Sequence, residues 1–545
     1  MKTTIRIFQT FIFILASFAA VAGNPNEPKP KLIVGIVIDQ MRYDYITRYW
    51  NKFGENGFKK LVNQGYNCTN THYNYVPTYT GPGHASIYTG TTPAAHGIIS
   101  NDWFNRATGR NIYVTEDANA NGVGTTSGAG KMSPSLLLTT TVTDELRAAS
   151  NFRSKVIGIA LKDRGAILPA GHSANAAYWY EGTSGNWISS SWYMNELPSW
   201  VSDFNNKKLP AKYLHKAWTT LQPIETYVES TADNVPYEES FPGETAPVFP
   251  HDFPKSNPNN FDIIKRCPYG NEITKEFALA ALKAENLGKD EFTDFLAISF
   301  SSPDYVGHQF GTHAIETQDT YLRLDLDLAE LIAKTEEQIG KGNVLFFLTA
   351  DHAAIPNPKF LSDNKIPAGL FNISAISDSL NKFMLAVYGP GKWVLAVDND
   401  QVYLDHTLIE TQKLNYDEMC DRIAGFLIRF KGVSGALTAK ELATMEYTYG
   451  IRSFVQKGFY QKRSGDVAII LEPGLIEYKL TGTTHGSPYT YDTHVPLLFY
   501  GWNIKSKTDH THINITDIAP TISNMLGIQP PNAATGNVIQ GIFEK

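Results

Sequence analysis

The 545-residue sequence has few cysteines and few charged residues. Its three cysteines, Cys68, Cys267 and Cys420, show no CxxC spacing, which excludes a thiolate metal site and a disulfide scaffold and leaves room for one bridge at most. Only 19% of the residues are charged and 42% are apolar, so the chain is not disordered and can bury a large core. A net charge of −7 argues against nucleic acid as a bulk partner. No internal repeat or low-complexity run is visible.

Long apolar runs are also missing, because the longest stretch near the N-terminus is shorter than the roughly 20 residues that span a bilayer. Lys2 and Arg6 precede this stretch, which runs from Phe11 to Ala22 and ends in small residues. The pattern is typical of a cleavable secretory signal, with a membrane anchor as the weaker alternative. It predicts a signal peptide at 1–22, a mature chain of 23–545 without a membrane span, and a periplasmic or secreted protein.

Six carboxylate and imidazole side chains stand at or near the ends of apolar or glycine-rich segments. They are Asp39, Asp304, His308, Asp351, His352 and His485. Oxygen and imidazole nitrogen are the ligands that Zn²⁺ takes when thiolates are absent, and strand ends bring distant residues together. The set therefore suggests a two-metal hydrolase.

Taken singly, these residues are weaker evidence. Asp39 at a strand end is often only the N-cap of a following helix. Asp351 and His352 together seldom close a buried strand without a partner charge, which favours a functional pair. Asp304 and His308 are four residues apart and share one face of a helical turn, although the glycine between them weakens the helix prediction.

Thr80 is the candidate nucleophile, in the stretch Tyr79-Thr80-Gly81-Pro82-Gly83. A small hydroxyl residue before Gly-Pro is typical of a helix N-terminus, where unpaired amides favour an anion. Thr80 alone would be taken for an N-cap. Beside metal ligands its hydroxyl can act as a nucleophile, because a Lewis-acidic ion stabilises the alkoxide.

Two cations follow the apolar run 155–161. Strand alternation predicts that Lys162 and Arg164 point to the same side with Asp163 opposite, and two adjacent cations repel unless an anion lies between them. The guanidinium of Arg presents a fork of donors that matches phosphate, and the ammonium of Lys presents a point charge, which favours a phosphoryl site. A solvated loop is favoured equally. Asn101 could add an amide donor, although an Asn before an Asp is more often a turn residue.

Strand-like runs alternate with helical patterns such as the apolar spacing in 321–332. The runs cover 31–39, 155–162, 293–301, 343–350 and 495–500. This alternation predicts an α/β fold with a doubly wound, mostly parallel central sheet, helices on both faces, and the site at the strands' carboxyl ends. Cap segments are inserted at about 165–290 and 356–480. The first is rich in aromatic residues, which either cap the site or pack among themselves to support the sheet.

These motifs resemble the alkaline phosphatase superfamily and, within it, the phosphate-irrepressible (PafA-type) bacterial alkaline phosphatases. The resemblance runs from the first strand to the end of the chain and includes Thr484-His485-Gly486 and the late stretch 517–522. The chain differs from the better-known alkaline phosphatases, which use Ser in an Asp-Ser-Ala context. It also lacks the Arg of the sulfatase motif, so sulfatase activity is less favoured.

The resemblance implies a role for each candidate residue. One Zn²⁺ would be held by Asp304, His308 and His485. The other Zn²⁺ would be held by Asp39, Asp351 and His352 beside Thr80, the residue that would be phosphorylated. Asn101, Lys162 and Arg164 would bind the nonbridging oxygens of the phosphoryl group.

The expected function is that of an exported, monomeric phosphomonoesterase acting on small phosphate monoesters through a phosphothreonine. Nucleotide pyrophosphatases and phosphodiesterases of the superfamily also use Thr, so a diesterase is the alternative. Lys162 and Arg164 favour the monoester, because its dianion presents one more charged oxygen. A noncatalytic phosphate- or metal-binding protein is less favoured, because it would not need a hydroxyl between the metals.

Overall fold

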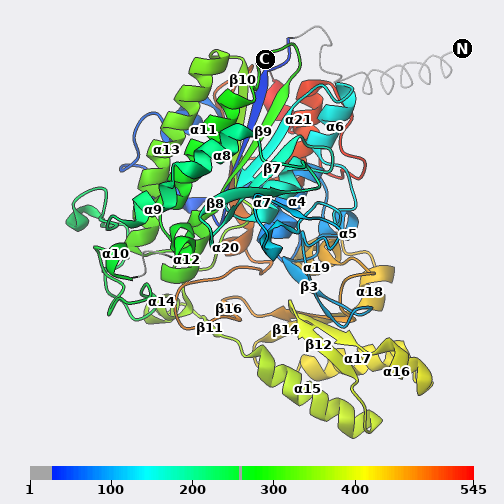
Figure 1. Ribbon diagram of the computed structural model, residues 1–545. Coiled ribbons are helices and arrows are strands. Elements are labelled where there is room, and N and C mark those ends of the chain that lie inside the picture. The colour runs from blue at the N-terminus through cyan, green and yellow to red at the C-terminus, as the bar shows by residue number, and fades with distance from the viewer. Residues whose placement is uncertain (1–27, 257–259, 545) are drawn as a thin grey trace, which may run out of the picture.

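The computed structural model describes residues 28–256 and 260–544, so the predicted signal peptide at 1–22 lies outside the described part. Eleven strands of the described residues form one central sheet, with the order β18-β2-β17-β10-β1-β9-β6-β7-β8-β5 and with β19 beside β2 (Figure 1). The bounds are β1 Leu32–Ile38, β2 Tyr66–His72, β5 Gly122–Val123, β6 Val156–Ala160, β7 Ala176–Glu181, β8 Asn186–Ser190, β9 Asp294–Phe300, β10 Val344–Thr349, β17 His494–Gly501, β18 Lys507–Asp509 and β19 Ile513–Asn514.

The middle of the sheet is parallel. Strands β10, β1, β9, β6 and β7 run in the same direction, whereas β17 and β8 are antiparallel to their neighbours. All residues of β1, β6, β9 and β10 are buried, as expected for parallel strands that are covered on both faces. The five predicted strands are confirmed, and the one at 495–500 is the antiparallel β17.

Helices cover both faces of the sheet, so the predicted doubly wound α/β fold is confirmed (Figure 1). One face carries α11 (Tyr269–Ala284) and α13 (Ile315–Ile339). The other carries α4 (Thr80–Thr89), α6 (Val142–Ala149), α7 (Asp163–Ala170) and α21 (Ile518–Leu526). Helix α21 contains most of the late stretch 517–522.

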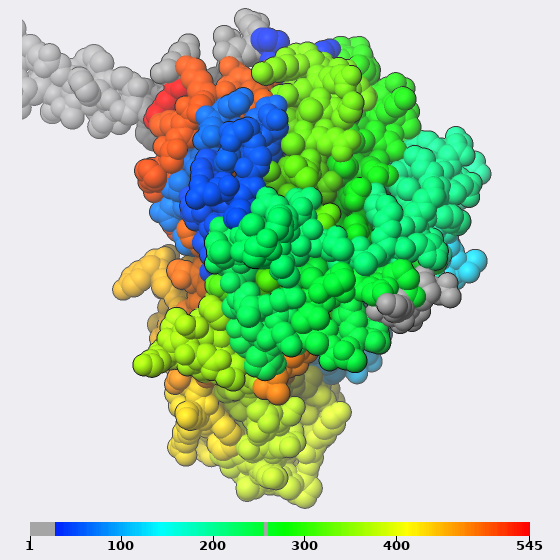
Figure 2. Space-filling model, turned by 90° about the vertical axis from the view of Figure 1, so that its left-hand side faces the viewer, coloured from blue at the N-terminus to red at the C-terminus, as the bar shows by residue number. Residues whose placement is uncertain are grey.

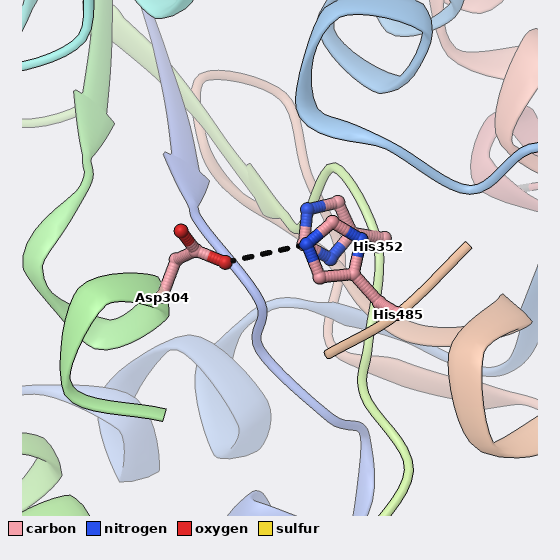
Figure 3. A group of neighbouring side chains, drawn as sticks. All are labelled: Asp304, His352 and His485. Atoms are coloured by element: carbon pink, nitrogen blue, oxygen red, sulfur yellow. Dashed lines mark ion pairs between the residues drawn. The ribbon is translucent and has the colours of Figure 1, made fainter. Parts of the chain in front are cut away.

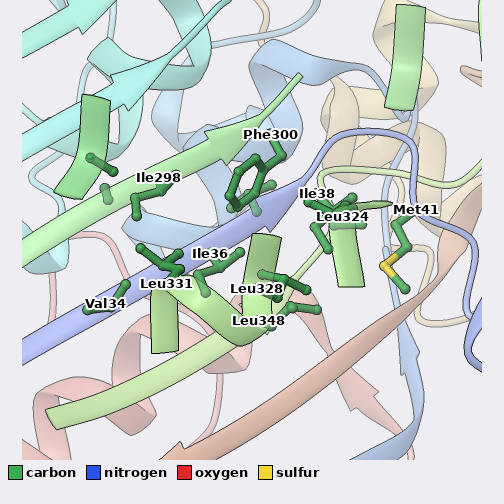
Figure 4. Close-up of a cluster of buried hydrophobic side chains, with 14 of the residues drawn as sticks. Val34, Ile36, Ile38, Met41, Ile298, Phe300, Leu324, Leu328, Leu331 and Leu348 are labelled. Carbon is green, nitrogen blue, oxygen red and sulfur yellow. The ribbon is translucent and has the colours of Figure 1, made fainter. Parts of the chain in front are cut away.

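The core below α13 shows why the apolar spacing in 321–332 marks a helix. Leu324, Leu328 and Leu331 recur on one face of α13 and are fully buried. They face apolar side chains at alternate positions of three neighbouring strands, which point to this side of the sheet (Figure 4). These partners are Val34, Ile36 and Ile38 of β1, Ile298 and Phe300 of β9, and Leu348 of β10.

Within the segment 356–480, residues between 371 and 471 form a lobe with its own apolar core, at the end of the molecule away from the C-terminus (Figures 1 and 2). Its four-stranded sheet has the order β12-β13-β15-β14. The strands are β12 Val394–Asp398, β13 Gln401–Leu404, β14 Val433–Thr438 and β15 Val467–Leu471, and they pack with α15 (Ile373–Tyr388) and α17 (Tyr416–Leu427).

The aromatic segment after residue 165 mainly supports the central sheet, because β7 and β8 belong to that sheet. Trp187 stacks on Phe277 of α11 with ring centroids 4.2 Å apart. Trp179 and Tyr180 of β7 also line a cavity that reaches Lys162, so the two roles weighed for these aromatics coexist.

The three cysteines are buried and free, so no disulfide joins them. Among the described residues, none of the helices combines the length and the apolar character needed to cross a membrane.

Candidate metal centre

The predicted ligands converge because their strands are parallel neighbours. In the sheet Ile38 of β1 lies beside Phe300 of β9, and Val37 lies beside Thr349 of β10. Asp39 directly follows β1, and the pair Asp351 and His352 follows β10. No helix begins at Asp39, since α2 (Asp44–Arg48) starts five residues later, so the capping alternative is excluded.

Helix α12 (Ser302–Phe310) follows β9 and carries Asp304 and His308 on one face. Their side chains are in contact, with His308 Nε2 3.1 Å from Asp304 Oδ1. The glycine between them does not interrupt the helix. The Gln40 side chain packs against this position and leaves no room for a larger residue, because a Cβ at Gly307 would lie 1.9 Å from Oε1 of Gln40.

Two groups of buried side chains have ligand atoms close enough to share an ion. The first ligand group is Asp39, Asp351 and His352, and the second is Asp304, His352 and His485 (Figure 3). The first matches the expected set. The second differs from it, because His352 takes the place expected for His308; the rings of His352 and His485 stack with centroids 3.5 Å apart.

Each histidine is oriented by a backbone carbonyl. Nδ1 lies 2.7 Å from Thr483 O in His308, 3.0 Å from Ala353 O in His352 and 2.7 Å from Thr78 O in His485. A proton on Nδ1 satisfies that carbonyl and leaves the Nε2 lone pair toward the carboxylates. This is the usual arrangement of imidazoles that ligate a metal.

The carboxylates of the first ligand group are buried and incompletely paired. Among the described residues, Asp39 Oδ1 and Asp351 Oδ2 have no hydrogen-bond partner. Asp351 Oδ1 accepts a hydrogen bond from the backbone N–H of Gln40 at 3.1 Å. Burial raises the pKa of Asp39 to about 6, against the lowering effect of Lys162. Buried oxygens of this kind need a cation, and the oxygen and nitrogen donors suit Zn²⁺.

Thr80 lies at the edge of this centre, as the first residue of α4. Its neighbour Tyr79 is the N-cap, with φ −116° and ψ 161°, so Thr80 is not a capping residue. Its Oγ1 is 3.5 Å from both His352 Nε2 and Lys162 Nζ. Gly83 allows this approach, since a Cβ there would lie 2.2 Å from the carbonyl oxygen of Asp351.

The alternation argument for Lys162 and Arg164 is wrong, because β6 ends at Ala160 and α7 begins at Asp163. Both cations still reach one cavity. Lys162 Nζ lies 2.7 Å from Asp39 Oδ2 and 2.5 Å from Asp304 Oδ2. Burial alone would lower the pKa of Lys162, but these two carboxylates raise it above its ordinary value, so the amine stays protonated.

Arg164 and Asn101 are held by specific contacts. Arg164 donates a hydrogen bond to Tyr113 Oη at 2.9 Å, and Tyr113 Oη donates to Asp163 at 2.5 Å. Asn101 Oδ1 accepts a hydrogen bond from the Gly81 amide of α4 at 2.8 Å, which leaves its NH₂ as a donor. A cavity of about 640 Å³ is lined by Lys162, Arg164, Tyr113, Trp179, Lys265 and Tyr305 among others.

Three supporting residues were not identified from the sequence. Gln40 donates to Asp304 Oδ1 at 2.7 Å. His84 bonds Thr80 O and Ser299 Oγ, each at 2.9 Å, and burial lowers its pKa to about 3, so it is neutral. Tyr113 holds Arg164 as described. Only the spacing of four between Thr80 and His84 could have been noticed, as one face of α4.

Comparisons with known proteins show the family to which the chain belongs. Residues 33–494 match the family described as type I phosphodiesterase / nucleotide pyrophosphatase. A protein of Myroides odoratus described as a calcium-transporting ATPase is 46% identical over 97% of this chain and 97% of its own. The alkaline phosphatase PhoV of Synechococcus elongatus is 46% identical over 95% of this chain and 93% of its own.

The crystal structure of the alkaline phosphatase PafA superposes with a TM-score of 0.92 at 43% identity, covering 95% of this chain and 100% of that chain. The likeness therefore extends over both insertions as well as the sheet. The chain belongs to the type I phosphodiesterase / nucleotide pyrophosphatase family of the alkaline phosphatase superfamily, in the branch that contains PafA and PhoV.

Proposed function

We propose that this protein is an exported phosphomonoesterase that hydrolyses phosphate monoesters to an alcohol and inorganic phosphate. The observation that carries the proposal is the placement of the buried Thr80 hydroxyl within 3.5 Å of both Lys162 and His352, beside two groups of metal-type ligands. The alkaline phosphatase names of PhoV and PafA support it.

Asp39, Asp351 and His352 would hold one Zn²⁺, and Asp304, His485 and His308 or the shared His352 the other. When bound, these ions would supply Lewis-acid stabilisation of the Thr80 alkoxide and of the leaving oxygen. His308 remains in the proposed set because its Nε2 lies 3.1 Å from Asp304 Oδ1 and its Nδ1 is already held by a carbonyl.

The chain's own groups bind and orient the phosphoryl group. Lys162 and Arg164 offer positive charge from the cavity wall, and Asn101 offers its amide NH₂ beside the N-terminus of α4. All three are fixed before substrate arrives, so their reorganisation adds little to the barrier. Tyr113 and Gln40 keep Arg164 and Asp304 in place.

The reaction would proceed in two displacements at phosphorus. Thr80 Oγ1 gives its proton to solvent and forms a bond to phosphorus as the bond to the leaving alcohol oxygen breaks, and the alcohol takes a proton from water. A water molecule then attacks the phosphothreonine from the vacated side, so that the phosphorus–Oγ1 bond breaks, Thr80 Oγ1 regains a proton and phosphate leaves. Two inversions give overall retention of configuration at phosphorus.

A phosphodiesterase is the second candidate, because the family description names that activity. The charges favour the monoester, since Lys162 and Arg164 complement the dianion better than a singly charged diester. Rates on an aryl phosphate and on its methyl diester separate the two. A kcat/KM that is higher for the diester would exclude the monoesterase.

The test of the proposal is metal analysis combined with activity on an aryl phosphate. We expect about two Zn²⁺ per chain, loss of activity in a chelator and recovery on adding Zn²⁺. Active protein with one metal or none would refute the two-zinc centre. The signal peptide at 1–22 and a monomeric state belong to the same proposal, and are checked by N-terminal sequencing of exported protein and by light scattering.

A further inference from the structure

A second set of ionisable side chains, three of them buried and two partly buried, lies outside the two ligand groups, where the segment 233–251 packs on the start of α13. This acidic cluster consists of Asp233, Glu238, Glu244, His251 and Glu316. His251 is fully buried between two carboxylates. Its Nδ1 is 3.1 Å from Glu244 Oε1, and its Nε2 is 3.1 Å from Glu316 Oε1.

Other oxygens of the cluster are left without a partner. The Glu238 side chain is only 6% exposed, and within 28–256 and 260–544 neither of its carboxylate oxygens has a hydrogen-bond partner. Glu316 is 0% exposed, and its Oε2 is unpartnered in the same residues. Buried carboxylate oxygens without a partner are strongly destabilising.

The positive charge within the cluster is insufficient. Burial alone would lower the pKa of His251, but Glu244 and Glu316 raise it to about 9, so the imidazole is charged. The cluster sets this single positive charge against four carboxyl groups. Burial, with the neighbouring Glu316 as a smaller cause, raises the pKa of Glu238 to about 10, so an ionised carboxylate is disfavoured at this position. Either a proton or a further cation must offset this cost.

We propose that Glu238 and Glu316 bind a hard divalent cation of the Ca²⁺ class. The free donors are oxygens, because both nitrogens of His251 are already bonded. Gln309 offers another, since its buried Oε1 has no partner in the described part of the chain. Its amide is held next to Glu238, with Nε2 2.9 Å from Glu239 O.

Such an ion would cross-link the segment 233–251 to the junction of α12 and α13. Glu239 N also donates to Gln309 O at 3.1 Å, so the two segments already touch there. Because α12 carries Asp304 and His308, the cation would stabilise the helix that presents these side chains to the metal centre. The site itself is independent of the proposed phosphatase reaction.

The test uses the full mature chain, stripped of metals with a chelator and reloaded with Zn²⁺. Adding Ca²⁺ at a hundredfold above its Kd should then raise Tm by roughly 3 °C, and equilibrium dialysis should find one Ca²⁺ per chain. Tb³⁺, which replaces Ca²⁺, should luminesce on tryptophan excitation, because the Trp218 ring centroid lies 5.2 Å from that of His251.

The matched variants are Glu238→Gln and Glu239→Gln. Glu239 is adjacent and 41% exposed, where it pairs with Lys479. Glu238→Gln should abolish the Ca²⁺-dependent rise in Tm and the Tb³⁺ signal without lowering the Zn²⁺ content, whereas Glu239→Gln should keep both signals.

The proposal is overturned if the Zn²⁺-loaded wild-type chain shows neither a Ca²⁺-dependent Tm nor Tb³⁺ luminescence, a readout that stands even where Glu238→Gln does not fold. It is equally overturned if Glu238→Gln binds Ca²⁺ as the wild type does. A rise in Tm on Glu238→Gln with no Ca²⁺ response in either protein would mean that a proton, not a cation, neutralises the pair.

Discussion

Replacing Gly307 by Ala should weaken the metal centre without unfolding the protein. Ala is the better helix former by about 1 kcal/mol in the interior of a helix such as α12. Its Cβ, however, would lie 1.9 Å from Gln40 Oε1. The Gln40 side chain must therefore move, and it would lose the 2.7 Å hydrogen bond that it donates to Asp304 Oδ1.

That oxygen is the one nearest to the histidines, at 3.1 Å from His308 Nε2 and 3.5 Å from His485 Nε2. A hydrogen bond to a charged group contributes about 1.5–3 kcal/mol. Losing an outer contact of a ligating carboxylate typically lowers metal affinity about 10–100-fold. We therefore expect Gly307→Ala to lose Zn²⁺ at chelator concentrations at least tenfold below those that strip the wild type.

Two further variants make this prediction specific. Gly425→Ala places the same methyl group inside α17, where no atom lies within 4 Å, and should leave Zn²⁺ retention unchanged. Gln40→Gly suits the positive φ of 66° at that position and removes the clashing side chain. The double variant Gly307→Ala, Gln40→Gly should then match Gln40→Gly alone. Wild-type Zn²⁺ retention in Gly307→Ala, or simple additivity in the double variant, would refute the reasoning.

Other variants test the reaction itself. Thr80→Ala should keep its metals and lose most activity, while Thr80→Ser keeps much of it; near wild-type turnover by Thr80→Ala would exclude the covalent route. Replacing Lys162 and Arg164 by Ala should lower the ratio of monoester to methyl-diester kcat/KM by roughly tenfold or more per residue, and equal losses on both substrates would contradict a role in dianion selection. Tyr113→Phe removes the hydroxyl that accepts from Arg164, so monoester kcat/KM should fall roughly tenfold with Tm nearly unchanged; unchanged kinetics would show that Arg164 needs no such support.

The sheet and the position of the centre were predictable because buried parallel strands have few polar residues. Strand β1 is an uninterrupted apolar run and β10 is apolar up to its last residue, so the first carboxylate or imidazole after each strand stands out, as Asp39 and Asp351 do. Parallel neighbours then place these residues at one edge of the sheet. The direction of β17 was not predictable, because its apolar residues fit either orientation equally well.

The contacts that orient the ligands were not predictable from the sequence. Gln40 meets Asp304 across 264 positions, and Tyr113 meets Arg164 across 51. Neither residue shows a periodicity or motif that would distinguish it from an ordinary surface residue. The acidic cluster was missed for the same reason, since Glu238 and Glu316 become buried neighbours only when an irregular segment packs on α13.

Lys162 shows why the comparison of substrates matters more than any single rate. Its ammonium lies 2.7 Å from Asp39 in the first ligand group, 2.5 Å from Asp304 in the second and 3.5 Å from Thr80. Removing it therefore disturbs both ligand groups and the nucleophile as well as the expected phosphoryl contact. Losses through the metals and Thr80 lower monoester and diester rates together, whereas loss of the phosphoryl contact falls on the dianion. Only the ratio of the two rates isolates the proposed role of Lys162 in choosing the substrate.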